Sequence, residues 1–346
     1  MASDLHYLVT GHTGFKGSWL TLMLTEQGHT VSGLALEPAP GSLYERARLS
    51  ELLHRDLRVD IRDGAATRDA ITALEPDVVL HLAAQPLVRE SYRDPRYTYE
   101  TNTLGTLNVL MAVENTPSVK AQVIITTDKV YRNVDQIWGY RESDPLGGVD
   151  PYSASKAAAD LITQSWMKTS GAGVPTAIAR AGNVIGGGDV CVDRLMVDLV
   201  AAFSAGQSVR IRNPGSVRPW QHVLDCLHGY LELADALLRG ESAGEAFNFG
   251  PDTDSFVQVG AVATAVAELW GTESLIEVDA GAHVHEAARL ALDPRKAELQ
   301  LGWRSRMTFH QALAWTVAWE KQIGAGGDAR AVSVAQISEF MGLAEG

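Results

Sequence analysis

The chain has 346 residues, of which 46% are hydrophobic and 21% charged, so it is long enough for one large α/β unit or two domains sharing a core. Its 29 basic and 42 acidic residues give a formal net charge of −13. The overall field therefore repels nucleic-acid phosphates and anionic lipids, which argues against both as partners.

Two features indicate a cytoplasmic protein. The cysteines, Cys191 and Cys226, are too few for a disulfide framework and are spaced unlike a metal knuckle. No run approaches the roughly 18 apolar residues of a membrane span, and MASDLHY lacks the basic start and apolar stretch of a signal peptide.

The first half of the chain alternates strand and helix patterns. Residues 5–10 form a short apolar run ended by Gly11, and apolar residues then recur at helical spacing up to Gly28. Further buried strands are expected at 30–36, 57–60, 77–84 and 122–128. This order predicts right-handed βαβ crossovers and a doubly wound, parallel Rossmann sheet of the α/β class.

Beyond about residue 180 the alternation breaks, and the stretches 182–189 and 212–220 have the composition of loops. A smaller, discontinuous substrate-binding domain is expected there, over the carboxyl ends of the strands. The predicted division is a Rossmann domain at 1–180 with a returning segment at about 220–250, a substrate domain at 181–219 and 251–330, and a tail at 331–346.

Three glycines, Gly11, Gly14 and Gly17 in TGHTGFKGSWL, follow the first strand and open the first helix. Free N–H groups and the positive end of the helix dipole would face a ligand there, as for a dinucleotide pyrophosphate. Such a triplet alone also fits a plain turn. The spacing G-x-x-G-x-x-G resembles that of the extended short-chain dehydrogenase/reductase superfamily.

That resemblance implies a nicotinamide cofactor. Glu37 lies 20 residues after the last glycine, where a carboxylate accepts from a ribose hydroxyl and repels a 2′-phosphate, so NAD is favoured over NADP. Arg46 and Arg48 could reverse this preference. The other cofactor contacts implied by the resemblance are Thr13, Phe15, Asp60, Ile61, Leu82, Ala83 and Ala84, of which Leu82 also fits plain strand core.

Tyr152 and Lys156 stand four apart in PYSASK, so they share a helix face, where an ammonium would lower the pKa of the phenol. In TTDK, Thr127 ends a predicted strand and supplies a hydroxyl. The superfamily resemblance implies that these three residues are its active-site triad, with Tyr152 as base and Lys156 also holding the nicotinamide ribose.

Asp128 and Lys129 follow the triad threonine, and the sequence here is similar to that of CDP-glucose 4,6-dehydratases, which carry an Asp-Lys acid–base pair at this place. Seven segments in the same order carry the resemblance: TGHTGFKGSWL, HLAAQPLVRESY, WGYRESDPLGGVDPYSASK, RAGNVIGGGD, RNPGSVRPWQHVLD, HEAARLALD and LGW. Val130, Arg132 and Arg289 depart from the family pattern, which leaves variant substrates open.

The resemblance implies oxidation of the sugar at C4, proton removal from C5 by Lys129 and donation to the leaving C6 hydroxyl by Asp128. The substrate contacts it implies are Gln85, Asn183, Arg194, Leu195, Arg212, Arg218 and Asn248. It also implies a homodimer in which helices at about 97–113 and 153–169 form a four-helix bundle, although the chain's own helices could equally cover those faces.

Other functions remain open from the residues alone. An epimerase would stop after C4 oxidation and would not need the Asp-Lys pair, and a regulatory protein would bind NAD without chemistry. His222, His283 and His285 could suggest a metal, but their spacing and lack of companion carboxylates favour structural hydrogen bonding and no metal site.

Overall fold

The structure, a computed structural model, describes residues 4–171, 173–252, 255–272, 276–279 and 289–343. Its central sheet has seven parallel strands in the order β10-β6-β5-β4-β1-β2-β3, which confirms the predicted doubly wound fold. The strands are β1 His6–Thr10, β2 Thr30–Ala35, β3 Arg55–Arg58, β4 Val78–His81, β5 Ala121–Ile125, β6 Thr176–Ala181 and β10 Ala246–Phe249.

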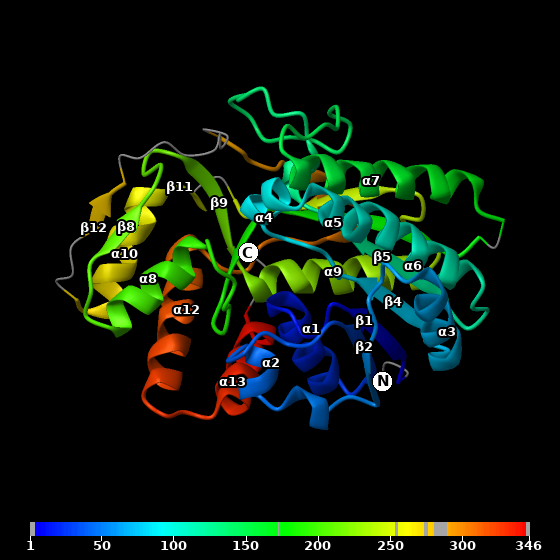
Figure 1. Ribbon diagram of the computed structural model, residues 1–346, viewed down its shortest axis with the longest axis horizontal. Coiled ribbons are helices and arrows are strands. Elements are labelled where there is room, and N and C mark those ends of the chain that lie inside the picture. Colours follow the sequence, from blue (N-terminus) through cyan, green and yellow to red (C-terminus); the bar gives the residue numbers. More distant parts are fainter. Residues whose placement is uncertain (1–3, 172, 253–254, 273–275, 280–288, 344–346) are drawn as a thin grey trace.

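Helices cover both faces of this sheet, as a parallel sheet requires (Figure 1). Alternate residues of β1 show the two layers, because Tyr7 and Val9 enter one core whereas Leu8 enters the other. The helices on the first face are α1 Phe15–Glu26, α2 Leu43–Arg46, α9 Val223–Leu238, α11 Arg295–Leu301 and α13 Ala329–Met341, and those on the second are α3 Gly64–Leu74, α4 Val88–Arg93, α5 Pro95–Tyr99, α6 Gly105–Glu114 and α7 Pro151–Thr169.

A smaller lobe stands beside the carboxyl ends of the strands (Figure 1). It holds a three-stranded sheet, β11-β9-β7, and a two-stranded sheet, β12-β8, around a separate apolar core. Its strands are β7 Asn183–Ile185, β8 Val209–Ile211, β9 Val217–His222, β11 Phe256–Gln258 and β12 Ile276–Val278, and its helices are α8 Leu195–Ser204, α10 Val259–Trp270 and α12 Phe309–Gly324.

Two expectations for this half of the chain are wrong. The stretches 182–189 and 212–220 contain β7 and most of β9, which pair in parallel, because short apolar strands among glycines resemble loops in composition. The expected tail at 331–346 is mostly α13, which packs on α1 through Ile337 and Phe340 in the main core.

The helix expected at about 97–113 is divided by a wider π turn, η2 Glu100–Leu104, between α5 and α6. This turn brings the Asn102 side chain to the strand-end loop, where it accepts from the Gln85 backbone N–H at 2.8 Å and donates to the Gln85 carbonyl at 3.0 Å. Asn102 also donates to the Ser155 hydroxyl at 2.9 Å, so the turn ties α7 to the loop after β4.

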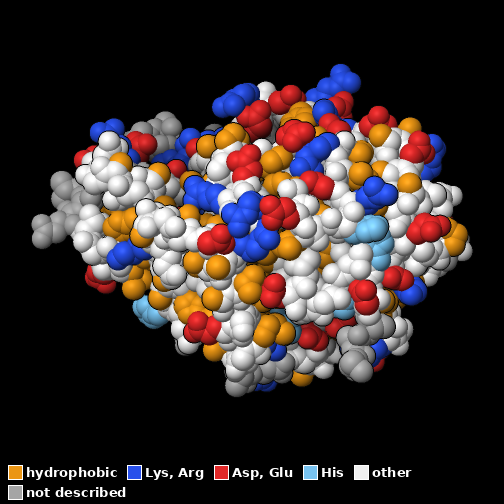
Figure 2. Space-filling model, turned by 90° about the horizontal axis from the view of Figure 1, so that it is seen from below, with side chains coloured by type: hydrophobic (Ala, Val, Ile, Leu, Met, Phe, Trp, Pro, Cys, Tyr) orange, Lys and Arg blue, Asp and Glu red, His pale blue; other side chains and the backbone are white. Residues whose placement is uncertain are grey.

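Charged and apolar side chains are mixed on the surface of the protein (Figure 2). On the face seen from below, basic, acidic and hydrophobic side chains are interspersed (Figure 2). No helix within the described residues combines the length and apolar character needed to cross a membrane.

A buried ion pair fixes α7 against the sheet. Arg180 on β6 donates twice to Asp160 on α7, at 2.8 Å each, and both side chains are at most 1% exposed. The hydroxyl of Thr126, directly after β5, donates to the same carboxylate at 3.1 Å. This contact sets the register of α7 relative to the end of β5.

Asp160→Asn is expected to lower the free energy of unfolding by about 3–5 kcal/mol, because it leaves the Arg180 guanidinium buried without a counter-charge. Urea unfolding of both proteins measures the loss. Glu241→Gln is the matched control, since its partner Arg239 is exposed, and it should change stability by less than about 0.5 kcal/mol. Equal, small effects for the two variants would contradict this role of the pair.

Candidate active site

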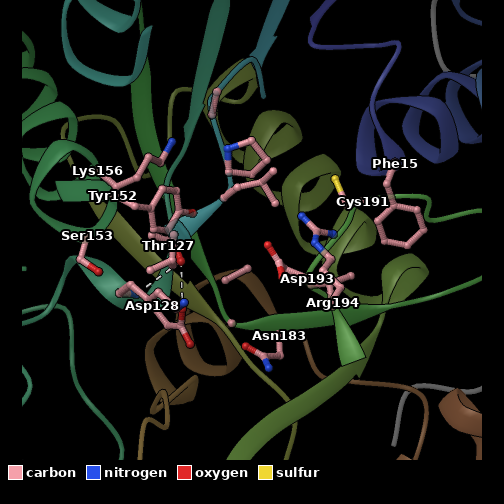
Figure 3. A pocket seen from close by; sticks show the side chains of 18 of the residues that line it. Phe15, Thr127, Asp128, Tyr152, Ser153, Lys156, Asn183, Cys191, Asp193 and Arg194 are labelled. Carbon is pink, nitrogen blue, oxygen red and sulfur yellow. Dashed lines mark hydrogen bonds between the residues drawn. The ribbon is translucent and has the colours of Figure 1, made fainter. Parts of the chain in front are cut away.

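A cavity of about 640 Å³ lies between the strand ends and the smaller lobe. Tyr152, Lys156, Thr127 and Asp128 lie on one side of it and Arg194 lies across from them (Figure 3). The predicted site residues that line this one cavity are Gly11, Thr13, Gly14, Phe15, Gly17, Asp60, Ile61, Leu82, Ala83, Ala84, Thr127, Asp128, Lys129, Tyr152, Lys156, Asn183, Arg194, Leu195, Arg212 and Arg218.

Each of the three loop glycines has a different structural role. Gly11 has a positive φ of 74°, and a Cβ there would lie 2.8 Å from the backbone nitrogen of Ala83. A Cβ at Gly17 would overlap the Gly11 carbonyl, whereas one at Gly14 would meet only that oxygen at 3.3 Å. Gly14 is exposed to the cavity at the start of the 12-residue α1, so this is the glycine that leaves room for a ligand at the helix N-terminus.

The two carboxylates predicted to contact the cofactor, Asp60 and Glu37, both pair with arginines. Asp60 lines the cavity, and a hydrogen bond from Arg62 lowers the pKa of this carboxyl. Glu37 does not line the cavity; its side chain is 80% exposed and pairs with Arg58 at 3.2 Å. Arg58 is also held by Asp56, so its single charge is balanced by two carboxylates.

Arg46 and Arg48 do not line the cavity either. Arg48 pairs with Asp328 on the far side of its helical turn, at 3.0 Å. Neither Arg46 nor Arg48 therefore lies on the cavity wall, where it could contact a 2′-phosphate.

Tyr152 and Lys156 occupy successive turns at the start of α7. Pro151 begins the helix and Asp150 caps it, accepting from the Ser153 N–H at 2.9 Å. The Lys156 ammonium donates to the carbonyl of Ile125, the last residue of β5, at 2.9 Å. The sequence spacing and this contact bring both side chains beside Thr127.

Burial dominates the protonation of this pair in the chain itself. It raises the pKa of Tyr152 to about 12, although the hydrogen bond with Thr127 opposes the change. Burial and then the neighbouring Lys16 lower the pKa of Lys156 to about 8. Lys156 is not among the main influences on this phenol, so the lowering of its pKa that was expected from an ammonium together with NAD⁺ depends on the charge of a bound cofactor.

Asp128 is buried at the lip of β5 with half of its carboxylate unpaired. Its Oδ1 accepts from the Thr127 hydroxyl at 2.9 Å, whereas Oδ2 is buried without a hydrogen-bond partner among the described residues. Burial raises the pKa of Asp128, although Lys129 and Thr127 oppose it. A carboxyl in this state is suited to carry a proton towards the cavity.

Lys129 lines the cavity beside Tyr152. It is half-buried, and its ammonium lies 5.7 Å from the centroid of the Tyr152 ring. The short 3₁₀ turn η3 Asp128–Val130, capped by Thr127, holds Asp128 and Lys129 together after the strand. A phenol, an acid and an amine thus converge on one space.

Arginines line the wall formed by the smaller lobe. Arg194 at the start of α8 pairs with Asp189 at 2.7 Å, and Arg212 lies 3.8 Å from Asp193. Arg218 on β9 is 8% exposed and lies close enough to Asp128 to oppose the rise in its pKa. Planar guanidinium groups in a partly buried wall suit the oxygens of a diphosphate.

Two predicted substrate contacts do not reach the cavity. The amide of Gln85 turns inward and donates to the Thr98 hydroxyl at 2.8 Å and to the Leu87 carbonyl at 3.1 Å. Asn248 is fully buried behind β6, where it accepts from the Tyr131 hydroxyl and donates to the Tyr140 carbonyl. Both are framework residues, which sequence position alone cannot distinguish from ligand contacts.

His222 is a helix cap. Its Nδ1 accepts from the Leu224 N–H at 3.3 Å at the start of α9, and burial lowers its pKa to about 3. His283 and His285 lie outside the described residues. Within those residues there is no group of three or more side chains that could hold a metal ion.

The sequence interpretation missed other charged residues of the cavity. Lys16 lines it from the first turn of α1, and Arg89 on α4 lines it and donates to Asp193 at 2.9 Å. A lysine heading a helix whose residues 17–24 are all buried is a signal that could have identified Lys16. For Arg89 the sequence offers none, because α4 reaches the smaller lobe only in the folded chain.

Comparison with known proteins defines the family. The model of the GDP-mannose 4,6 dehydratase family matches residues 8–316. The chain belongs to this family. A CDP-glucose 4,6-dehydratase of Salmonella typhimurium is 44% identical to it, over 96% of this chain and 95% of that one.

Solved structures of similar proteins share the family fold. A dTDP-glucose 4,6-dehydratase from Streptomyces venezuelae, with NAD and TYD bound, has a TM-score of 0.80 at 26% identity and covers 94% of this chain and 99% of that chain. A UDP-glucose 4-epimerase of Thermus thermophilus in complex with NAD has a TM-score of 0.77 at 27% identity, covering 92% and 99%. Dehydratases and epimerases therefore share this architecture, and the residues within the cavity have to distinguish them.

Asp128→Asn is expected to stabilise the protein at neutral pH, because the raised pKa of Asp128 means that its ionised form costs stability in the folded state. The gain should vanish below the unfolded pKa of aspartate, about 3.9, where both states are protonated. It should grow as the pH rises through the folded pKa and then remain constant. Urea unfolding across this pH range measures it, and a stability difference independent of pH would contradict the assignment.

Proposed function

We propose that the protein is an NAD-dependent CDP-glucose 4,6-dehydratase that forms CDP-4-keto-6-deoxyglucose. The single observation that carries the proposal is the Asp128-Lys129 pair beside Tyr152 in one cavity, an acid and an amine that C4 oxidation alone would not need. The Salmonella typhimurium relative, a CDP-glucose 4,6-dehydratase, supports the nucleotide. The NAD-bound structures of the two related enzymes support the cofactor.

The cavity fits a bound NAD. Gly14 leaves the N-terminus of α1 open to a pyrophosphate, and Lys156 would hold the nicotinamide ribose. Neither Arg46 nor Arg48 lines the cavity, which favours NAD over NADP. A bound NAD⁺ would supply the hydride acceptor for C4 of the sugar and, once reduced, the hydride donor for C6, so the reaction would have no net redox change.

The side chains move the protons. Tyr152 removes the proton of the C4 hydroxyl, assisted by Thr127, and the resulting ketone makes the C5 proton acidic. Lys129 takes the C5 proton, and Asp128, kept protonated by burial, gives its own proton to the C6 hydroxyl, which leaves as water. Lys129 then returns its proton to C5. Tyr152 ends with the C4-hydroxyl proton and Asp128 ends one proton short, so the passage of a proton from Tyr152 to Asp128, directly or by exchange with solvent, restores both groups. The arginines Arg194, Arg212 and Arg218 would hold the diphosphate.

A panel of nucleotide sugars tests the substrate and the reaction together. With CDP-glucose the product should be lighter by one water and carry a 4-keto group, as measured by mass spectrometry. Turnover of dTDP-, GDP- or UDP-sugars alone would reject CDP-glucose. A product of unchanged mass with an inverted hydroxyl would identify an epimerase, and NAD binding without any turnover would identify a non-catalytic protein.

Lys129→Met is expected to keep the fold and C4 oxidation but to lower turnover by about 10²–10⁴-fold, because the C5 proton loses its base. Enzyme mixed with CDP-glucose should then accumulate NADH absorbance. Tyr152→Phe is the matched comparison, since it removes the first proton acceptor and should show neither NADH nor product. Full turnover in Lys129→Met would remove this lysine from the base role.

A homodimer is also proposed, formed through α5, α6 and α7. These helices and the π turn η2 carry exposed large apolar side chains, namely Tyr99, Leu104, Met111 and Leu161. A second copy of the same surface would cover them by two-fold symmetry in a four-helix bundle.

The free thiols of Cys191 and Cys226 support a reducing compartment, which we take to be the cytoplasm.

Combined Leu104→Glu and Leu161→Glu substitutions should convert this dimer to a monomer, because they bury charge in the proposed interface. Sedimentation velocity measures the change. Val278→Glu introduces a charge at an equally exposed site of the smaller lobe and should leave the dimer intact. A monomeric wild-type protein, or a dimeric double variant, would refute the arrangement.

A further inference from the structure

Lys16 is a cation that lines the active-site cavity and takes no part in the proposed proton transfers. It lies in the first turn of α1, directly after the loop glycines, and its side chain is half-buried. Its ammonium donates to the hydroxyl of Tyr230 at 3.2 Å and lies 5.7 Å from the centroid of that ring. Tyr230 is fully buried on α9, so the Lys16 side chain points from the glycine loop towards the protein interior and not to solvent.

The charge of Lys16 acts on the catalytic residues. It contributes to the lowered pKa of Lys156 and opposes the raised pKa of Asp128. Its side-chain partners are the neutral phenol of Tyr230 and the thiol of Cys226, whose pKa is raised by burial. No carboxylate within the described part of the chain lies at ion-pair distance from Lys16. Lys16 is therefore a fixed positive charge without a balancing anion, in an enclosed site where electrostatic effects are stronger than in water.

We propose that Lys16 makes bound NAD⁺ a stronger hydride acceptor, an inference that rests on the proposed function. The nicotinamide ring is a cation in NAD⁺ and neutral in NADH, so a nearby fixed positive charge disfavours the oxidised form relative to the reduced one. Lys156, the residue proposed to hold the nicotinamide ribose, already experiences this charge. A ring held beside Lys156 experiences it as well.

The proposed reaction gives this effect a use. Oxidation of a secondary alcohol by NAD⁺ is unfavourable at neutral pH, and the enzyme has to form the C4 ketone before any proton can leave C5. A stronger hydride acceptor raises the amount of ketone present for elimination. The same charge weakens the binding of NAD⁺ relative to that of NADH.

A second role for a lysine here would be to bind the cofactor pyrophosphate. The pyrophosphate is the same in NAD⁺ and NADH, so a phosphate ligand would strengthen the binding of both forms equally. The ratio of the two affinities therefore distinguishes hydride-acceptor tuning from phosphate binding, and it does so without measuring catalysis.

The experiment equilibrates the protein with mixtures of NAD⁺ and NADH, removes free nucleotide and quantifies what stays bound. Lys16→Met and Lys16→Gln remove the charge, and the glutamine retains a donor for Tyr230 if the methionine variant fails to fold. The preference for NADH over NAD⁺ should fall on the order of tenfold in both, about 1.4 kcal/mol. Lys16→Arg should restore the wild-type ratio.

Lys168→Met is the matched control, because it removes an exposed lysine at the end of α7 that does not line the cavity. Its ratio should equal that of the wild type. An equal loss of NAD⁺ and NADH binding in Lys16→Gln would make Lys16 a phosphate ligand and overturn the proposal, as would unchanged binding of both. A wild-type protein that binds neither nucleotide would overturn the proposed function and this inference together.

Discussion

The register of α7 against the end of β5 is the constraint on which the active site depends. One helix carries Tyr152, Lys156 and Asp160 at four-residue intervals, so a single alignment places all three. Lys156 is attached to the last carbonyl of β5, and Asp160 is held by Arg180 from β6. The buried ion pair lies one turn beyond the reactive groups, where it orders the site without taking part in proton transfer.

Burial sets the protonation of the side chains in the cavity, at a cost to the stability of the protein. It favours the neutral form of Asp128, which is the form able to donate a proton to a leaving hydroxyl, and it also keeps the Tyr152 phenol protonated in the chain itself. The Thr127 hydrogen bond and the positive charge of Arg194 lower the pKa of this phenol, as the positive charge of a bound nicotinamide would. The acid Asp128 and the base Tyr152 of the proposed reaction therefore need the same burial but different neighbouring charges. Asp128 lies on the turn after β5 and Tyr152 lies on α7, so each residue can have its own charged neighbours.

Sequence patterns predicted the sheet and most of the cavity for a physical reason. Strand ends, loop glycines and helix starts are defined by local chemistry, and the topology brings them to one edge, as for Gly14, Thr127 and Tyr152. Side-chain direction is not local: Asn102 reaches Gln85 through a π turn that no periodicity reveals, and Tyr131 and Tyr140 keep Asn248 in the framework. The short strands β7 and β9 and the packing of α13 depend on distant partners and were not predicted correctly.

Dehydratases and epimerases share this architecture, so the fold alone does not determine which of the two reactions takes place. The glycine loop, the tyrosine and the lysine supply cofactor binding and C4 oxidation, which both reactions need. Elimination needs an acid and a base on the C5 and C6 side of the sugar, and these come from one short turn after β5. Because that turn follows Thr127 directly, a change of two residues alters the outcome while the frame set by Asp160 and Arg180 stays the same. In the proposed mechanism the distinction between the two reactions is therefore a property of residues 128 and 129 and not of the fold.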